Sequence, residues 1–206
     1  MPRWLIVSVM LGGSLTALAL TWERHLSPAE RGKYLVRALG CDDCHSPKIP
    51  GPGGMPIRDA TRLLSGHPEG HPFPIWTPAD LERRNAAMFA GAMRTAWAGP
   101  WGVSFAANLT PDKETGLGNW TEDMFIQTIR TGKHQGQPTS RDVLQPMPWA
   151  NINHGTVGSP EDDLKAIWAY LQTLPPIRNR VPPPVPPKTP IQLADHESHG
   201  SKTTGT

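Results

Sequence analysis

The stretch Cys41-Asp42-Asp43-Cys44-His45 contains both cysteines of this 206-residue chain. Two thiols three positions apart, followed directly by a histidine, form a covalent haem attachment sequence. Thioether bonds from both thiols to one edge of the porphyrin carry the next residue beneath the ring, where its imidazole can bind the iron. The stretch therefore predicts one haem c, held by Cys41 and Cys44, with His45 as an axial ligand.

Other uses of the two cysteines fit the surrounding sequence less well. Together with His67 and His71 they could form a zinc site. Gly70 and Pro72, however, disfavour the helix that would present both histidines to one metal. A thioredoxin-like redox pair would need a βαβ context, which the sequence does not contain. Two cysteines are also too few for a disulfide scaffold or a four-thiolate metal site.

Met147 is the predicted second axial ligand. It lies between Pro146 and Pro148, and proline fixes its own backbone while restricting the residue before it. The methionine is therefore held on a stiff, non-helical segment, which suits a ligand kept at one distance from iron. A thioether keeps the iron six-coordinate and raises its reduction potential, whereas a second histidine would lower it. The alternatives, which stay open, are His134, His154 and Met93.

Composition excludes some functions and predicts an irregular chain. Lys and Arg total 20 and Asp and Glu total 18, so no strong positive field is available for nucleic acid. The 24 prolines and 20 glycines predict long loops and disfavour a large sheet. Apolar residues make up 37% of the chain, enough for a modest core.

The N-terminus is predicted to be an export signal or an anchor. Arg3 is followed by an uncharged run, residues 4–22, which is about long enough to span a bilayer. The run also fits a signal peptide with a cleavage site at Ala17-Leu18-Ala19. Both alternatives for residues 1–22 remain open. Either one predicts export, in a bacterial cell to the periplasm, with attachment to the inner membrane if residues 4–22 are retained.

The exported part is predicted to be one helical domain, residues 27–177. Ser27 and Glu30 form a capping box that starts a helix ending at Gly40, just before the haem attachment sequence. Trp97, Trp101 and Phe105 are predicted to pack together as a covering loop.

Three further helices are predicted from capping residues and apolar periodicity. They cover residues 77–93, 121–130 and 160–174, the last of them capped by Ser159. Residues 178–206, rich in proline and then in polar residues, are predicted to form an extended or disordered tail.

The order of these features resembles a class I c-type cytochrome. The shared features are a capped first helix, the attachment sequence at its end, a late methionine in a loop and an amphipathic last helix. The resemblance implies an all-α haem domain with long Pro/Gly-rich loops. It also implies that the first and last helices cross, with Gly32 and Tyr34 meeting Trp168 and Tyr170.

Two other stretches make the resemblance to c-type cytochromes more specific. Residues 108–122 and 147–149 are similar to the single-haem modules of cytochrome c subunits of bacterial dehydrogenases. This similarity implies that Asn108 and Trp120 line the haem edge or its propionates. The long insertion between His45 and Asn108 departs from the pattern.

These features predict an electron carrier, not an enzyme, with His45 and Met147 as iron ligands and no catalytic residue. The expected partners are redox proteins such as a dehydrogenase, a quinol-oxidising complex or a terminal oxidase. One alternative is a haem enzyme or gas sensor with an open or displaceable sixth ligand. Another is an electron-relay subunit found only within a dehydrogenase or oxidase complex.

Overall fold

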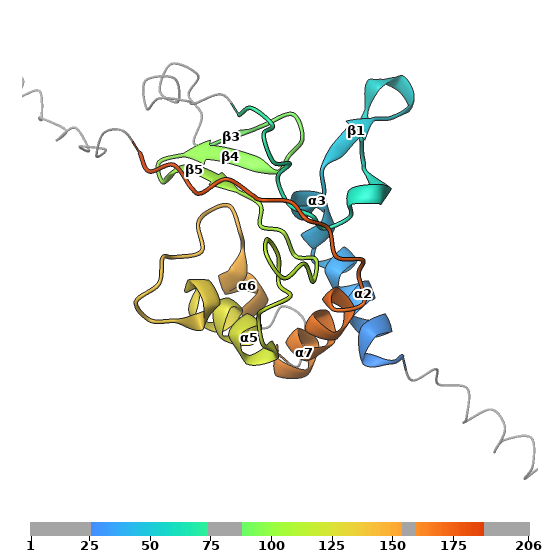
Figure 1. The fold of residues 1–206 in the computed structure, drawn as a ribbon, viewed down its shortest axis with the longest axis vertical. Helices are drawn as coiled ribbons and strands as arrows, with labels where there is room; N and C mark the ends of the chain where they lie inside the picture. Colours follow the sequence, from blue (N-terminus) through green and yellow to red (C-terminus); the bar gives the residue numbers. More distant parts are fainter. Residues whose placement is uncertain (1–25, 74–87, 154–159, 188–206) are drawn as a thin grey trace, which may run out of the picture.

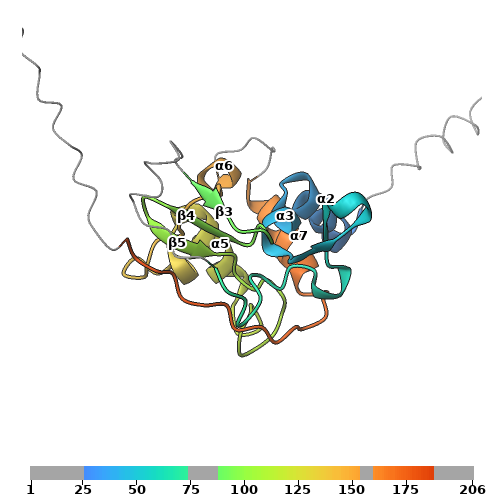
Figure 2. The same ribbon diagram turned by 90° about the horizontal axis from the view of Figure 1, so that it is seen from above.

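The structure is a computed structural model that describes residues 26–73, 88–153 and 160–187. Its helices are α2 (Pro28–Ala38), α3 (Cys41–His45), α5 (Glu122–Thr131), α6 (Trp149–Asn153) and α7 (Pro160–Leu171). Its strands are β1 (Lys48–Pro50), β2 (Pro56–Arg58), β3 (Phe89–Ala90), β4 (Ala96–Gly99) and β5 (Gly102–Phe105). Single 3-10 turns are η1 (Pro52–Gly54), η2 (Ala60–Arg62) and η3 (His134–Gly136). The β3–β5 sheet lies to one side of the helices, and the β1–β2 hairpin projects beside α3 (Figures 1 and 2).

Within the described ranges, no helix is long and apolar enough to span a bilayer. The signal peptide or anchor predicted at residues 1–22 lies outside those ranges, as does the capping residue Ser159.

The first helix, α2, begins and ends as the sequence predicts. The backbone N–H of Glu30 donates to Ser27 Oγ at 3.3 Å, and the Ser27 N–H donates to Glu30 Oε2 at 2.9 Å. Gly40 follows with a φ of 70°, in the left-handed region that glycine adopts without strain. The chain therefore turns directly from α2 into α3, which carries the attachment sequence.

Helices α2 and α7 cross at Gly32. A Cβ atom at this position would lie only 1.9 Å from the carbonyl oxygen of Ala166, so the two backbones are in direct contact. Leu35 and Leu164, both 2% exposed, pack in the core formed at this crossing. The expected crossing of the first and last helices is therefore present. The expected contact of Tyr34 is wrong, because Tyr34 lies on the outer face of α2 and is exposed.

Helix α5 completes the apolar core. It begins after Thr121, whose hydroxyl accepts from the Met124 N–H at 3.1 Å, and it ends at Gly132. Its buried face packs toward α7, where the rings of Phe125 and Trp168 have centroids 5.7 Å apart. Helix α3 thus lies next to a core built by three longer helices.

Residues 48–58 form the antiparallel β1–β2 hairpin. The hairpin is fastened to the attachment helix at its base. Lys48 Nζ donates to the carbonyl oxygen of Asp43 at 2.6 Å, and Arg58 donates to Asp42 Oδ2 at 2.8 Å. Part of the insertion therefore supports α3 directly.

The expectation of an all-α fold is wrong for residues 89–105. Strands β3, β4 and β5 form an antiparallel sheet in that order, with Trp97 on β4 and Phe105 on β5. The helix predicted over 77–93 is also wrong at its described end, because residues 88–93 are not helical. Instead, the Arg94 N–H donates to the Gly91 carbonyl at 2.8 Å and closes a tight turn between β3 and β4. The sheets remain small, as the high proline content predicts.

The tail predicted to be extended or disordered is extended where the structure describes it. Residues 178–187 are extended, and Val185 forms an antiparallel bridge with Val103 of β5. The proline-rich segment is ordered there because neighbouring segments supply the hydrogen bonds that it cannot make internally. Residues 188–206 lie outside the described part of the chain.

Candidate haem-binding site

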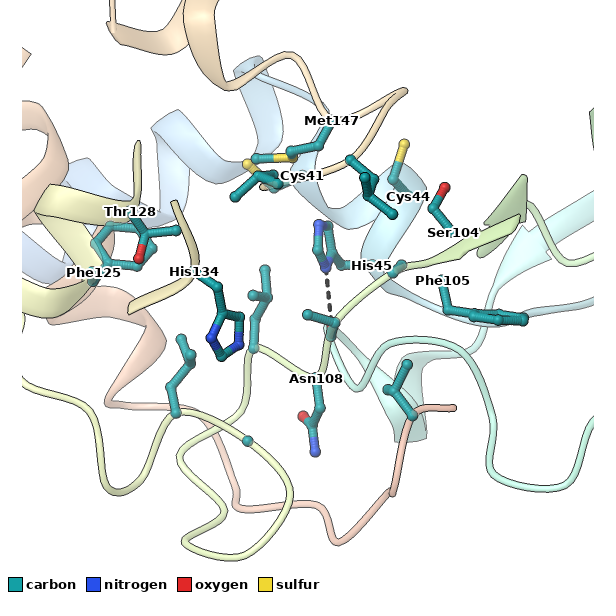
Figure 3. A pocket seen from close by; sticks show the side chains of 18 of the residues that line it. Cys41, Cys44, His45, Ser104, Phe105, Asn108, Phe125, Thr128, His134 and Met147 are labelled. Atoms are coloured by element: carbon teal, nitrogen blue, oxygen red, sulfur yellow. Dashed lines mark hydrogen bonds between the residues drawn. The ribbon is translucent and has the colours of Figure 1, made fainter. Parts of the chain in front are cut away.

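A cavity of about 520 Å³ lies between the helices, the sheet and the C-terminal segment. Its apolar wall includes Val36 of α2, Phe125 of α5 and Leu164 of α7. All six residues predicted for the site line this one cavity: Cys41, Cys44, His45, Asn108, Trp120 and Met147. Figure 3 shows most of them around the cavity, although they come from well-separated parts of the sequence.

The two thiols belong to the same short helix, α3, where positions three apart lie on one side. Neither cysteine is in a disulfide. Burial, reinforced by the negative charge of Asp42, raises the pKa of the Cys41 thiol to about 12. Burial also raises the pKa of Cys44. Both side chains are therefore protonated at neutral pH, and both are held at the cavity.

His45 is oriented by a backbone carbonyl. Its Nδ1 lies 2.8 Å from the carbonyl oxygen of Ala107, so Nδ1 carries the proton and donates it (Figure 3). The other ring nitrogen, Nε2, is left with its lone pair available. Burial lowers the pKa of His45, which favours the neutral imidazole. A neutral ring fixed through one nitrogen is the arrangement in which histidine binds a metal through the other.

Met147 reaches the cavity from the loop before α6. It packs against the hydrophobic core, and its backbone N–H donates to the Leu144 carbonyl at 3.2 Å. Of the alternatives to Met147, His134 also lines the cavity, whereas Met93 lies in the β3–β4 turn and is not part of the lining. The third alternative, His154, lies outside the described residues.

Asn108 and Trp120 contact protein groups at the edge of the cavity. Asn108 Nδ2 donates to the Ile177 carbonyl at 2.8 Å, and its Oδ1 accepts from the N–H and the hydroxyl of Thr110. The indole of Trp120 meets the ring of His134 edge-on, with centroids 5.3 Å apart. The amide of Asn108 therefore fastens its loop to the C-terminal segment.

The cavity suits a covalently attached haem. Apolar helix faces line much of it, two thiols lie on one side, and an oriented neutral imidazole and a thioether complete the set of donors. This donor set matches the one that binds haem in c-type proteins.

Part of the cavity wall carries no recognisable sequence motif. Residues 180–184 line it, although they were placed in a separate tail. The cationic side chains of Arg141 and Arg180 also reach the lining. For residues 180–184, the only sequence signal was the run of prolines. No motif indicated that Arg141 or Arg180 would line the cavity.

His67 and His71 do not join the cysteines in a metal site. Within the described ranges, no group of three or more His, Cys, Asp or Glu side chains is placed to hold a metal ion. His67 is 1% exposed, and both its ring nitrogens are engaged by protein. Nδ1 lies 2.9 Å from the hydroxyl of Thr95, and Nε2 lies 3.2 Å from the carbonyl oxygen of His71. The zinc alternative therefore has no support here.

The buried ring of His67 predicts acid sensitivity. Burial lowers its pKa below the unfolded value of about 6.5. The unfolded chain then binds the proton first, so the free energy of unfolding should fall as the pH drops below about 6.5. We expect His67→Gln to reduce this fall, measured by denaturant unfolding at several pH values between 7 and 5. An identical pH dependence in the variant and the parent would contradict the prediction.

These features define a chain that resembles c-type cytochromes: an attachment sequence ending the first helix, an oriented histidine and a late methionine around one cavity. Comparison with known proteins narrows the resemblance to cytochrome c subunits of bacterial dehydrogenases, as the sequence motifs predicted. No protein-family model matches the chain.

Three relatives illustrate the similarity. The gluconate 2-dehydrogenase cytochrome c subunit of Pantoea cypripedii is 28% identical over 81% of this chain and 27% of its own length. A diheme cytochrome c-type protein of Cereibacter sphaeroides is 30% identical over 82% of this chain and 44% of its own length. The fructose dehydrogenase cytochrome subunit of Gluconobacter japonicus is 26% identical over 73% of this chain and 23% of its own length. The chain thus spans less than half the length of these relatives.

Proposed function

We propose that this protein is a c-type cytochrome that carries single electrons between redox proteins. The observation that supports this most directly is the shared cavity of Cys41, Cys44, His45 and Met147, with His45 oriented by a carbonyl oxygen. When bound, the haem supplies an iron that alternates between the ferric and ferrous states. No catalytic side chain is required for this function.

Each residue has a separate role in the proposal. The Cys41 and Cys44 thiols would hold the porphyrin through thioether bonds, which form by addition of S–H to vinyl groups and need no oxidant. His45 would bind the iron through Nε2, while the Ala107 carbonyl keeps the proton on Nδ1. Met147 would be a second ligand through its thioether sulfur. With both residues as ligands, the site would leave no position for a substrate.

One haem is proposed for this chain. One of the relatives is described as diheme. This chain has two cysteines, both in the single attachment sequence, so it can attach one haem through two thioether bonds.

The proposed partner is a dehydrogenase. Two of the relatives are cytochrome subunits of gluconate 2-dehydrogenase and of fructose dehydrogenase. A relay subunit within such a complex is therefore the second candidate, favoured by these names. A quinol-oxidising complex would be an alternative electron donor, and a terminal oxidase would be an electron acceptor. We further propose that residues 1–22 direct the chain to the periplasm, and fractionation of cells expressing the full chain would test this.

Covalent haem attachment is the test of the proposal. The full chain, made in cells that attach haem to c-type cytochromes, should gain the mass of one haem and keep it after denaturation. Each single variant, Cys41→Ala or Cys44→Ala, should retain the group through one thioether, and the double variant should lose it. A parent protein that carries no haem, or a double variant that still holds it covalently, would overturn the proposal.

A further inference from the structure

We propose that residues 177–187, here called the strap, act as a wall of the haem cavity that limits its exposure to water, with Asn179 as the positioning residue that holds this wall. The inference rests on the proposed function, because it concerns the same cavity. It assigns a role to a segment that is remote in sequence from the attachment motif.

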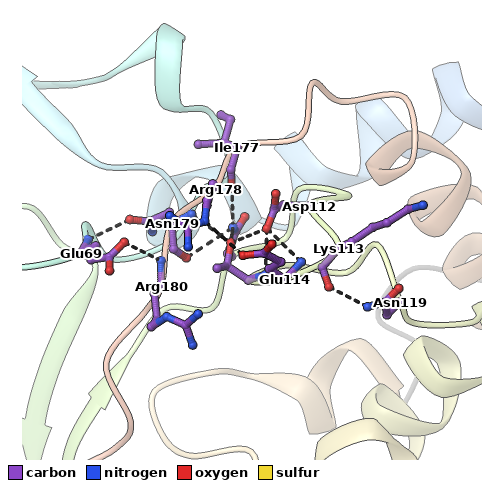
Figure 4. A network of polar contacts seen from close by, with 11 residues as sticks. Glu69, Asp112, Lys113, Glu114, Asn119, Ile177, Arg178, Asn179 and Arg180 are labelled. Atoms are coloured by element: carbon purple, nitrogen blue, oxygen red, sulfur yellow. Dashed lines mark hydrogen bonds and ion pairs between the residues drawn. The ribbon is translucent and has the colours of Figure 1, made fainter.

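The strap is anchored at one end by the buried side chain of Asn179, which is 1% exposed. Its Nδ2 donates to the carbonyl oxygens of Ser65 at 2.6 Å and His67 at 2.8 Å. Its Oδ1 accepts from the Arg62 guanidinium at 3.0 Å. The same oxygen accepts from the Glu69 N–H at 2.8 Å (Figure 4). All the hydrogen-bonding positions of one amide are thus used to hold residues 62–69 against the strap.

This anchor is close to the groups that orient the axial histidine. The Gly66 N–H, next to Ser65, donates to the His45 carbonyl at 2.8 Å. The Ile177 carbonyl accepts from Asn108, the residue after the carbonyl that fixes the His45 ring. The strap, the loop at residues 62–69 and the histidine therefore form one connected set of hydrogen bonds.

A second anchor holds the other end of the strap on the sheet. Val103 and Val185 exchange two backbone hydrogen bonds, at 2.8 and 2.9 Å. The strap approaches so closely that a Cβ atom at Gly102 would lie 2.0 Å from the Val185 carbonyl oxygen. Gly102 also has a φ of 94°, which disfavours any other residue.

Between the two anchors, the strap forms part of the cavity wall. The lining residues of this span are Arg180, Val181, Pro182, Pro183 and Pro184. Consecutive prolines stay extended without internal hydrogen bonds and resist collapse. These three prolines also lack N–H groups, so their part of the span adds no backbone donors that would retain water at this edge.

A wall that keeps water out has a predictable effect on the iron. Exclusion of water lowers the local dielectric, which disfavours the more highly charged ferric state relative to the ferrous state. Loosening the strap should therefore shift the reduction potential to more negative values. A loosened strap should also allow small water-soluble reagents to reach the haem faster.

The test uses three substitutions in the full chain. Asn179→Ala removes the first anchor, and Gly102→Ala displaces the second. Asn119→Ala is the control, since Asn119 is exposed and its side chain donates to the Lys113 carbonyl, away from the strap. We expect both anchor variants to shift the potential to more negative values and to raise severalfold the rate of ferrous haem oxidation by ferricyanide, while the control matches the parent.

The outcomes separate this inference from the proposed function. A parent chain without covalent haem would contradict both the proposed function and the inference about the strap. A parent with haem, and anchor variants that are less stable but keep its potential and oxidation rate, would reduce the strap to a structural role and overturn the inference. If Asn179→Ala does not fold, the reduction potential and oxidation rate of Gly102→Ala test the inference in the same way. Amide hydrogen exchange at Val103 and Val185 should be faster in the anchor variants, since their mutual hydrogen bonds close that end.

Discussion

Carbon monoxide should bind to the Met147→Ala variant of the reduced protein and should leave the parent protein unchanged. In the proposed site the thioether occupies the sixth coordination position, and alanine cannot reach the iron. The reduced variant would then offer an open position to the ligand. Because the thioether also favours the ferrous state, the reduction potential of the variant should fall. Absorption spectra of both oxidation states, with and without carbon monoxide, measure the effect.

Met55→Ala is the matched control for this prediction. Met55 is an exposed methionine in the β1–β2 hairpin, so the substitution removes the same atoms outside the cavity. The control should keep the spectrum of the parent. A parent that binds carbon monoxide readily would favour the enzyme or gas-sensor alternative. A Met147→Ala variant that still ignores carbon monoxide would point to His134, which also lines the cavity.

The second large effect is expected at the crossing of α2 and α7. Gly32→Ala places a Cβ atom 1.9 Å from the Ala166 carbonyl oxygen and 2.8 Å from Tyr170 Cβ, so the two helices have to separate. Overpacking of this kind should lower the free energy of unfolding by about 3 kcal/mol. The better helix propensity of alanine, worth about 1 kcal/mol, offsets only part of this. Denaturant unfolding of the two proteins gives the difference.

Lys33→Ala serves as the control in the same helix. Lys33 is exposed, and the change should alter the free energy of unfolding by no more than about 0.5 kcal/mol. A Gly32→Ala protein as stable as the parent would show that the backbones do not touch at this point. Because α2 leads directly into the attachment sequence and contributes Val36 to the cavity, the substitution should also displace this part of the cavity wall.

The helices were predictable because their signals are local. The capping box of Ser27, the Thr121 cap and the proline at position 160 each lie within one turn of the helix that they start. Capping and periodicity can be read from neighbouring residues without knowledge of the fold. The beginnings of α2 and α7 were therefore predicted at the correct residues, and that of α5 within one residue.

The strands could not be predicted in the same way, because they depend on pairing between segments. The turn at Gly91 interrupts a sequence that otherwise resembled the end of a helix, and β4 finds its partners on both sides. The bridge between Val103 and Val185 joins positions more than eighty residues apart. No local pattern around residue 185 indicates that partner.

The predicted site residues were brought together, but the groups that position them were not predicted. Cys41, Cys44, His45 and Met147 follow from a motif and a proline pair, and all four line the cavity. The Ala107 carbonyl that orients His45 has no sequence signal, because any residue supplies a carbonyl oxygen. Asn179 was likewise hidden within a segment whose composition predicts disorder.

The parts of the cavity wall are made at different times during synthesis of the chain. They extend along the chain from Val36 to Pro184, so a ribosome releases the attachment sequence well before the last helix and the final wall exist. During that interval, α2 lacks the helix that it will cross at Gly32. If haem is joined to the thiols then, the reacting chain is an open peptide instead of a finished cavity. Helix α7 and the strap would then enclose a haem that was attached earlier. The completed fold would need no opening wide enough to admit the haem.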